Sequence, residues 1–455
     1  MTNAADTIVE DITTRYLARH QKSKAHAEIA RRYVPGGVTR ITTFFAPYPM
    51  YMERGAGAYL FDCDGNRYID FLGNYTALVH GHAHPAIVAA ITAQAQKGTI
   101  YGAASPLQYE LARMICERVP SIDLLNFCSS GTEATMMAMR AARAITGKNL
   151  VVKIDGGYHG SNDYGLVNLA VTPEGVTKAA LPGVPPGVID SMLVAPFNDL
   201  ELMEEMFMEH RDQIAAVILE PLLGNGGGVL PRPGYLQTLR QLTRQYGILL
   251  IFDEVVTLRL HTGGYQQLCG VTPDLTTLGK LIGGGMGIGA FGGNRALMER
   301  FDPANPRLLY HTGTFYAQEI GMAAGIASLQ NLDQEAIDRI NALGARLRDG
   351  FNRSFAGHGI RGQTLGIGSL AMIHWTQEKI SAVSHAQGAL KAAAALPRLL
   401  HLEMINHGIY SAPRGMFCIS TPMTDADVNE AVQAFDATLE TLKPYMAEQT
   451  PHLLL

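Results

Sequence analysis

The sequence lacks an apolar run long enough to cross a membrane, and its first twenty residues contain no apolar core of a secretory signal. It has no basic excess either: the formal net charge is −5, which argues against a nucleic-acid-binding surface. The five cysteines form no CxxC pair and no zinc-ligand spacing, so we expect buried thiols and no metal site. These absences favour a protein of the cytoplasm that binds neither nucleic acid nor membrane.

What the sequence does have is apolar bulk. Hydrophobic residues make up 47% of the 455 residues and charged residues 17%, which is typical of a globular protein with a large core. At roughly 100 to 200 residues per domain, this length predicts two or three domains.

The middle of the chain alternates strand-like with helix-like segments. Helical patterns such as 235–247, and the helix expected after Ser130, separate apolar runs of strand length. These runs lie at 124–130, 150–155, 215–220 and 248–253. Strand and helix in succession predict an α/β fold with a mainly parallel sheet, which we assign to a large domain at 76–325.

The flanking parts predict a smaller α+β domain, formed by 1–75 and 326–455. Its expected elements are one amphipathic helix ending at Pro35-Gly36-Gly37, a hairpin at 57–71 around Asp64-Gly65, a helical stretch at 316–356, short strands near 365–374 and 416–421, and a final helix at 425–446.

Asp253 and Lys280 are the first candidates for chemistry. Asp253 closes an apolar strand, at the sheet edge where α/β proteins bind ligands; it is either a strand-end cap, a metal ligand or the partner of a protonated ring nitrogen. Lys280 lies in a glycine-rich apolar stretch, where partial desolvation favours the neutral, nucleophilic amine. The alternative for Lys280 is an ordinary surface lysine.

Two further segments suit a phosphate and an aromatic ring. Ser130-Gly131-Thr132 joins a strand to a helix, where free N–H groups favour an anion, although a plain helix cap has the same appearance. Tyr158 and His159 lie in GGYHG directly after a strand, where a tyrosine can stack on a heteroaromatic ring. The segment at 311–315, HTGTF, offers more hydroxyl and N–H donors.

Two motifs suggest other kinds of site, a dinucleotide site and a metal site, but both are weak signals. GIGAFG at 287–292 matches the dinucleotide fingerprint, but it follows glycines instead of a strand, and no acidic residue stands about 20 positions later. The histidines of HGHAHP at 80–85 have no carboxylate array beside them, so packing or capping explains them better than a metal.

Taken together, SSGTEA, GGYHG, AAVILEP, FDEV, LTTLGKLIGGG and HTGTF resemble the class III (subgroup II) aminotransferases of pyridoxal 5'-phosphate (PLP) fold type I. The sequence looks most like the glutamate-1-semialdehyde 2,1-aminomutases and, among their relatives, the β-phenylalanine aminotransferases. The narrower resemblance lies in PGGVTRITTFFAPYP, DEVVTLRL and IYSAPRGMFCIS.

The resemblance implies a role for each matched residue. Lys280 would form the Schiff base with PLP and move the proton, and Asp253 would keep the pyridine nitrogen protonated. The other expected cofactor contacts are Ser130, Gly131, Thr132, Tyr158, His159, Glu220, Asn225, Val255 and Thr314, the last from the partner subunit of a homodimer. Arg40 would bind the carboxylate of a β-amino acid and Arg414 that of the α-keto acid, because a guanidinium pairs bidentately with a carboxylate.

The resemblance thus implies a transaminase that moves an amino group from an aromatic β-amino acid, or a related amine, to 2-oxoglutarate or pyruvate. The alternatives are an intramolecular aminomutase or a racemase at the same site, a nicotinamide oxidoreductase that rests on GIGAFG, and a silent PLP-binding module. Tyr316 and Gln318 depart from the family pattern, and 177–187 is expected to be a variable substrate lid. The sequence does not predict the preferred amine, its enantiomer or the pathway.

Overall fold

The computed structural model describes residues 3–168 and 181–455. The chain divides into two compact units. Unit 1 comprises Met1–His84, Arg339–Glu378 and Gly388–Leu455, and unit 2 comprises Pro85–Asp338 and Lys379–Gln387. Of the segment predicted as a lid, residues 177–180 lie outside the described part.

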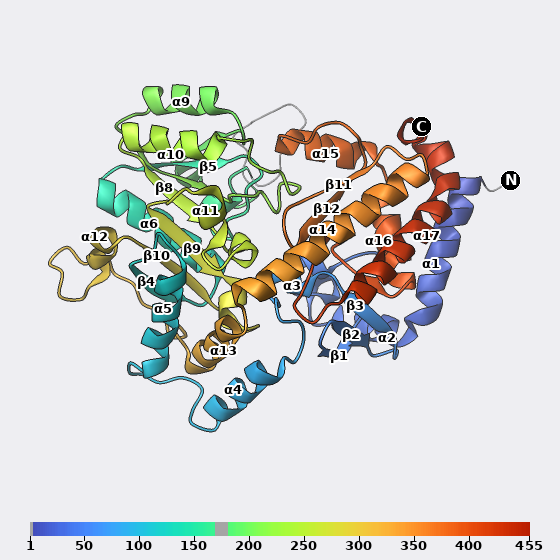
Figure 1. The fold of residues 1–455 in the computed structure, drawn as a ribbon, viewed down its shortest axis with the longest axis horizontal. Helices are drawn as coiled ribbons and strands as arrows, with labels where there is room; N and C mark the ends of the chain where they lie inside the picture. Colours follow the sequence, from blue (N-terminus) through green and yellow to red (C-terminus); the bar gives the residue numbers. More distant parts are fainter. Residues whose placement is uncertain (1–2, 169–180) are drawn as a thin grey trace. The chain divides into compact units, whose positions relative to one another are not determined.

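Unit 2 is built on a seven-stranded sheet in the order β4-β10-β9-β8-β7-β5-β6 (Figure 1). Its strands are β4 (Leu124–Cys128), β5 (Leu150–Ile154), β6 (Met192–Ala195), β7 (Ile214–Leu219), β8 (Leu249–Asp253), β9 (Leu275–Gly279) and β10 (Gly289–Gly293). β10 runs antiparallel to β4 and β9, whereas β9, β8, β7, β5 and β6 pair in parallel. The sheet is therefore mainly parallel, as predicted.

The helices of unit 2 include α6, which packs against β4, β7, β8, β9 and β10. Its small buried residues, among them Ala134, Ala138 and Ala142, let the helix lie close to the sheet. The helices are α4 (Pro85–Ala95), α5 (Pro106–Arg118), α6 (Gly131–Thr146), α7 (Asp163–Leu166), α8 (Pro186–Asp190), α9 (Leu200–Glu209), α10 (Tyr235–Gln245), α11 (Gly264–Cys269), α12 (Arg295–Met298) and α13 (Glu319–Gln330). Short 3-10 turns are η3 (Thr257–Leu260), η4 (Lys280–Gly283) and η5 (Glu299–Phe301).

Unit 1 contains two small sheets, β1-β2-β3-β13 and β11-β12-β14. Their strands are β1 (Met52–Ala56), β2 (Tyr59–Asp62), β3 (Arg67–Asp70), β11 (Gln363–Leu365), β12 (Leu370–His374), β13 (Ile409–Tyr410) and β14 (Met416–Cys418). β2 and β3 form the predicted hairpin.

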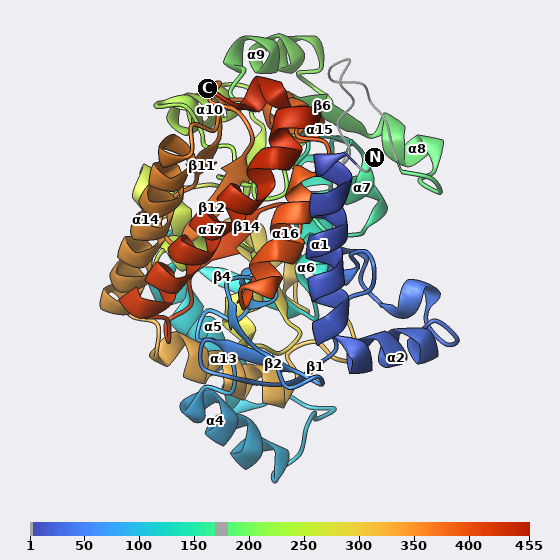
Figure 2. The same cartoon turned by 90° about the vertical axis from the view of Figure 1, so that its right-hand side faces the viewer.

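The helices of unit 1 bring the two ends of the chain together. α1, α16 and α17 lie side by side (Figure 2). The helices are α1 (Ala4–Arg19), α2 (Gln21–Ala30), α3 (Gly73–Thr76), α16 (Leu396–Asn406) and α17 (Asp425–Gln449), with 3-10 turns η1 (Pro35–Gly37), η2 (Ile41–Thr43) and η6 (Pro451–Leu453). α14 (Gln334–Gly357) and α15 (Val383–Ala392) each have residues in both units.

Two predicted helices are each divided in the structure. The first breaks at His20, whose φ of −125° and ψ of 46° stop α1; the buried imidazole lies 2.6 Å from the Tyr68 hydroxyl. The stretch predicted at 316–356 breaks between α13 and α14, because Asp333 accepts from the Ala336 N–H at 2.8 Å and starts a new helix. The final helix starts as predicted, at a capping box of Thr424 and Asp427.

A methyl group at Gly289 should destabilise the fold. The added Cβ would overlap the carbonyl oxygen of Ser130. We expect Gly289→Ala to lose about 1–3 kcal/mol, read as a lower thermal midpoint of the apoprotein. Gly187→Ala is the control, because nothing lies within 4 Å of its Cβ; equal midpoints for the two variants would contradict the prediction.

Candidate active site

The carboxyl ends of neighbouring strands in unit 2 carry the predicted site residues. Gly289, at the start of β10, pairs with Cys128 at the end of β4 and with Gly279 at the end of β9. Asp253 at the end of β8 pairs with Thr277 of β9. The sheet register therefore gathers the segments that follow β4, β8 and β9 at one edge.

Asp253 is the most constrained of these residues. It is 4% exposed, and its Oδ1 accepts from the Val255 N–H at 3.2 Å and the Thr277 hydroxyl at 3.1 Å. Its Oδ2 lies 2.8 Å from His159 Nδ1. His159 is also buried, and its Nε2 has no hydrogen-bond partner among the described residues.

Helix α6 begins directly after β4 and supplies an anion site. The Ser130 hydroxyl accepts from the Glu133 N–H at 3.2 Å, and the Glu133 carboxylate accepts from the Ser129 N–H at 2.7 Å. The first N–H groups of a helix have no intrahelical acceptor, so those of Gly131 and Thr132 suit a phosphate. Thr132 Oγ1 accepts from the Ser161 N–H at 3.2 Å.

Val255 lies beside two glycines. A Cβ at Gly131 would lie 3.3 Å from both methyl carbons of Val255, and a Cβ at Gly279 would lie 3.4 Å from Val255 Cγ1. Glycine at both positions keeps the face of Val255 open next to the start of α6. This arrangement can receive a flat ring.

Lys280 follows Gly279 and starts η4 with a φ of 52°. The left-handed region is unfavourable for lysine, and such strain is found most often where function requires it. The backbone thus turns sharply at Lys280, directly after the end of β9.

Glu220 follows β7 and is 5% exposed. Its Oε1 accepts from the Tyr158 N–H at 2.9 Å and its Oε2 from the Gly224 N–H at 3.2 Å. Burial raises the pKa of the Glu220 carboxyl, and the charges of His159 and Lys280 oppose that rise. Glu220 thereby links the segment that bears Tyr158 to the segment that bears Asn225.

Sequence reasoning missed two buried charges in β5 and just beyond it. Lys153 is fully buried and donates to the Val167 carbonyl at 2.6 Å, while Asp155 accepts from the Asn168 amide at 2.5 Å. Burial lowers the pKa of Lys153 to about 8 and raises the pKa of Asp155 to about 6. Together they anchor both ends of the segment that carries Tyr158 and His159; the signal was the charged pair in the otherwise apolar run LVVKID.

The HTGTF segment packs near the start of α6. His311 Nε2 lies 2.9 Å from the Phe127 carbonyl, and its ring stacks on Tyr316 at 4.8 Å between centroids. Tyr316, one of the two departures from the family pattern, donates to Glu133 Oε1 at 3.5 Å. Thr314 is exposed on this segment.

The two candidate substrate arginines belong to unit 1. Arg40 donates from Nη1 to Asn74 Oδ1 at 2.7 Å. Arg414 lies in the turn between β13 and β14, where the Gly415 N–H donates to the Ala412 carbonyl at 2.9 Å. Each arginine therefore lies in a segment that hydrogen bonds hold in place.

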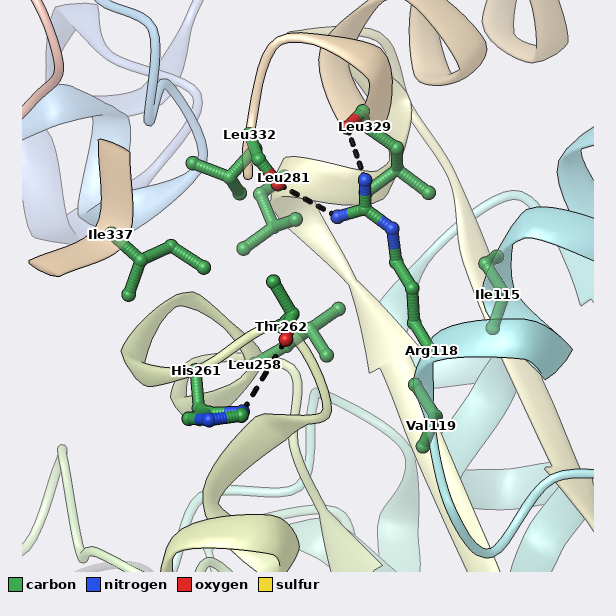
Figure 3. Close-up of a pocket in the computed structure, with 10 residues that line it drawn as sticks. All are labelled: Ile115, Arg118, Val119, Leu258, His261, Thr262, Leu281, Leu329, Leu332 and Ile337. Atoms are coloured by element: carbon green, nitrogen blue, oxygen red, sulfur yellow. Dashed lines mark hydrogen bonds between the residues drawn. The ribbon is translucent and has the colours of Figure 1, made fainter. Parts of the chain in front are cut away.

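A pocket elsewhere in unit 2 contains none of the predicted site residues (Figure 3). The guanidinium of Arg118 points at the carbonyl oxygens of Leu329 and Leu332, at the end of α13. Leu258, Leu281 and other apolar side chains complete the lining. We interpret this pocket as the place where a half-buried arginine caps a helix.

The competing motifs do not form sites. GIGAFG runs into β10 instead of a helix, contrary to the dinucleotide-binding geometry. His82 Nε2 bonds Asp70 Oδ2 at 2.7 Å and His80 Nδ1 lies 3.1 Å from the Thr421 hydroxyl. No group of three metal-binding side chains occurs within residues 3–168 and 181–455. No helix in those ranges is long and apolar enough to span a membrane.

The residues of unit 2 fit PLP. The start of α6 offers donors for a phosphate, Val255 with Gly131 and Gly279 leaves room for a flat ring, and Asp253 is a buried carboxylate that can face a cationic nitrogen. The amine of Lys280, directly after β9, is the type of nucleophile that reacts with the aldehyde carbon of the cofactor.

Comparison with known proteins gives the family of this chain. A family model described as aminotransferase class-III matches residues 45–439. The chain is 40% identical to glutamate-1-semialdehyde 2,1-aminomutase 2 of Bacillus pumilus, over 93% of this chain and 99% of that protein.

Two solved structures are similar over nearly the whole chain. An ω-transaminase from Sphaerobacter thermophilus has a TM-score of 0.89 at 41% identity, covering 92% of this chain and 97% of that one. A β-phenylalanine aminotransferase from Variovorax paradoxus has a TM-score of 0.89 at 38% identity, covering 96% and 98%.

The mainly parallel sheet and the site at its edge define a PLP-dependent enzyme of fold type I. The chain belongs to the class-III aminotransferase family and is a PLP-dependent transaminase.

A methyl group at Gly131 should weaken cofactor binding without weakening the fold. The Cβ would reach the methyl carbons of Val255, while the first position of α6 accepts alanine readily. We expect Gly131→Ala to raise the Kd of PLP about tenfold, or about 1.4 kcal/mol, in absorbance titrations of the apoprotein. The thermal midpoint of the apoprotein serves as control, and an unchanged Kd would contradict the role of this face.

Proposed function

We propose that this transaminase moves the amino group of an aromatic β-amino acid to an α-keto acid such as 2-oxoglutarate or pyruvate. Arg40 carries the proposal: it offers a guanidinium, held by Asn74, in a sequence context that resembles the β-phenylalanine aminotransferases. The similarity to the Variovorax paradoxus enzyme over 96% of the chain supports it.

In unit 2, Lys280 Nζ would be the base that moves the proton from the amine-bearing carbon of the substrate to C4' of the cofactor. Asp253 would pair with the protonated ring nitrogen, and His159 orients this carboxylate through the 2.8 Å contact. PLP, when bound, supplies the electron sink that stabilises negative charge at the substrate carbon.

The remaining residues hold the cofactor in place. Ser130, Gly131 and Thr132 would bind its phosphate, Val255 and Tyr158 would hold its ring, and Glu220 and Asn225 would line the site. Tyr158 is 43% exposed, which leaves its ring available for stacking. Arg40 binds the carboxylate of the β-amino acid, and Arg414 that of the keto acid.

We further propose a homodimer in the cytoplasm, in which Thr314 of the partner subunit reaches the phosphate. Three large apolar side chains near this threonine in the sequence are exposed: Leu308 by 43%, Tyr310 by 65% and Phe315 by 63%. Such a group of exposed apolar side chains is unusual on a surface that faces water. Light scattering of the holoenzyme tests the dimer. The division into a cofactor domain at 76–325 and a small domain of 1–75 and 326–455 is part of the same proposal.

A second candidate is an intramolecular aminomutase. Curated relatives that are 40% identical to this chain are named glutamate-1-semialdehyde 2,1-aminomutases. DEVVTLRL at 253–260 departs from the Gly-Phe-Arg ending of the mutase-like sequences and favours the transaminase.

A half-reaction separates the two candidates. The PLP-loaded protein is mixed with 3-amino-3-phenylpropanoate without any keto acid. We expect the absorbance of the Schiff base between PLP and Lys280 to bleach and to return on addition of 2-oxoglutarate. Lys280→Ala should bind PLP but show no such cycle of bleaching and recovery. No bleaching by this amine, together with isomerisation of glutamate 1-semialdehyde without a keto acid, would establish the mutase instead.

Arg414→Ala should harm only the keto-acid half of the reaction. Hydrogen bonds to a charged group contribute about 1.5–3 kcal/mol, so we expect the KM for 2-oxoglutarate to rise roughly 10- to 100-fold. The rate of the half-reaction with 3-amino-3-phenylpropanoate should stay within about threefold of wild type. Equal losses in both halves would contradict the division of roles between the two arginines.

A further inference from the structure

Four successive residues of unit 1 adopt left-handed backbone conformations. The φ angles of Gly73, Asn74, Tyr75 and Thr76 are 51°, 49°, 56° and 74°, so α3 is a left-handed turn. Glycine and asparagine tolerate this region, whereas tyrosine and the β-branched threonine do not. Left-handed residues normally occur singly, so a run of four needs strong support from its surroundings.

Asp70 supports the start of this turn. Its Oδ1 accepts from the N–H groups of Leu72 at 2.9 Å and Gly73 at 3.0 Å. Its Oδ2 lies 2.7 Å from His82 Nε2, which keeps the carboxylate in place. The Thr76 N–H donates to the Leu72 carbonyl at 3.1 Å and closes the turn.

Tyr75 supports the turn from the other side. Its hydroxyl donates to the Thr42 carbonyl at 2.6 Å, and its ring packs against the cluster of Leu72, Met372, Ala412 and Met416. The turn is thereby tied to the segment at 40–43, which contains Arg40. The Thr43 hydroxyl donates to the Arg40 carbonyl at 2.7 Å and fixes that residue's backbone as well.

These contacts of the turn fix the position of the side-chain amide of Asn74. Asn74 Oδ1 accepts from Arg40 Nη1 at 2.7 Å. A guanidinium has five N–H donors, so one bond to the amide leaves the others for a carboxylate. The amide is also neutral, so it orients the guanidinium without cancelling its charge, as an aspartate would.

We propose that Asn74, held by the left-handed turn, is a positioning residue that presents Arg40 to the carboxylate of the substrate and so sets the preference for amino acids over simple amines. This inference rests on the proposed function, because it takes Arg40 as the carboxylate-binding residue.

Asn74→Gly separates the effect of the side-chain amide from the effect of the backbone conformation. Glycine accepts a positive φ more readily than asparagine, so the turn should persist while the amide is lost. A thermal midpoint of the holoenzyme at or above that of wild type checks that the fold is retained. Asn74→Asp is the matched variant of the same shape, which adds a charge that pairs with Arg40.

The two variants are compared on a substrate pair that differs in the carboxylate, 3-amino-3-phenylpropanoate and 1-phenylethylamine. We expect Asn74→Gly to raise the KM for the amino acid about tenfold, equivalent to about 1.4 kcal/mol, with kcat and the KM for the amine nearly unchanged. Asn74→Asp should raise the KM for the amino acid further. Binding of unreactive 3-phenylpropanoate, followed through the cofactor's absorbance, should weaken in the same order and does not depend on turnover.

The Arg40→Ala variant separates failure of this inference from failure of the proposed function. In that background, Asn74→Gly should have no further effect on carboxylate binding. If Arg40→Ala weakens binding of the carboxylate but Asn74→Gly does not, the role of Asn74 is wrong and that of Arg40 stands. If Arg40→Ala also binds both carboxylates as wild type does, the proposed role of Arg40 fails, and with it this inference. Equal KM shifts for both substrates in Asn74→Gly would show a merely structural effect.

Discussion

A buried carboxylate is expensive unless its environment satisfies it, and Asp253 is a buried carboxylate. At the end of β8 it accepts from a backbone N–H, from Thr277 of the next strand and contacts His159 from the segment after β5. Three separate parts of unit 2 must therefore be in register for this one side chain to be stable. The same register brings the start of α6 and Lys280 to the same edge, so the fold that satisfies Asp253 also gathers the residues proposed to hold the cofactor.

The residues proposed for the chemistry and those proposed for specificity belong to different units of the chain. The residues matched to the cofactor belong to unit 2, whereas Arg40, Asn74 and Arg414 belong to unit 1. The comparisons agree on the family and on PLP but include both aminomutases and transaminases. Such a spread is expected when one set of residues performs the proton transfer and another recognises the rest of the substrate.

The sequence predicted the parts of the fold that depend on strong local patterns. β4, β5, β7 and β8 are apolar runs bounded by turn residues, and the final helix begins at a recognisable capping box. β9 and β10 were not predicted as strands, because LTTLG and GAFGG owe their strand structure to pairing with each other across the sheet. The break at His20 depends on a buried contact with Tyr68, which local propensity does not contain.

The same rule holds for the candidate site: residues in recognisable sequence patterns were predicted, whereas features that depend on tertiary contacts were not. Sequence motifs indicated Asp253, Lys280 and the start of α6 as candidates, and the family resemblance indicated the two arginines. The buried contacts of Lys153 with Val167 and of Asp155 with Asn168 were missed, as was the left-handed turn at Gly73–Thr76, because each depends on tertiary contacts. The residue types at Tyr75 and Thr76 do not indicate a positive φ, since both residues disfavour it.

The rate of the amine half-reaction in Asp253→Asn, measured with PLP bound, is the most direct test of the site. Asparagine keeps the size of the side chain and can accept from Val255 and Thr277, but it cannot neutralise a cationic ring nitrogen. We predict that the variant binds PLP and that the half-reaction slows by about 100-fold or more. A rate within a few-fold of wild type would contradict the assignment of Asp253 as the carboxylate that faces the cofactor.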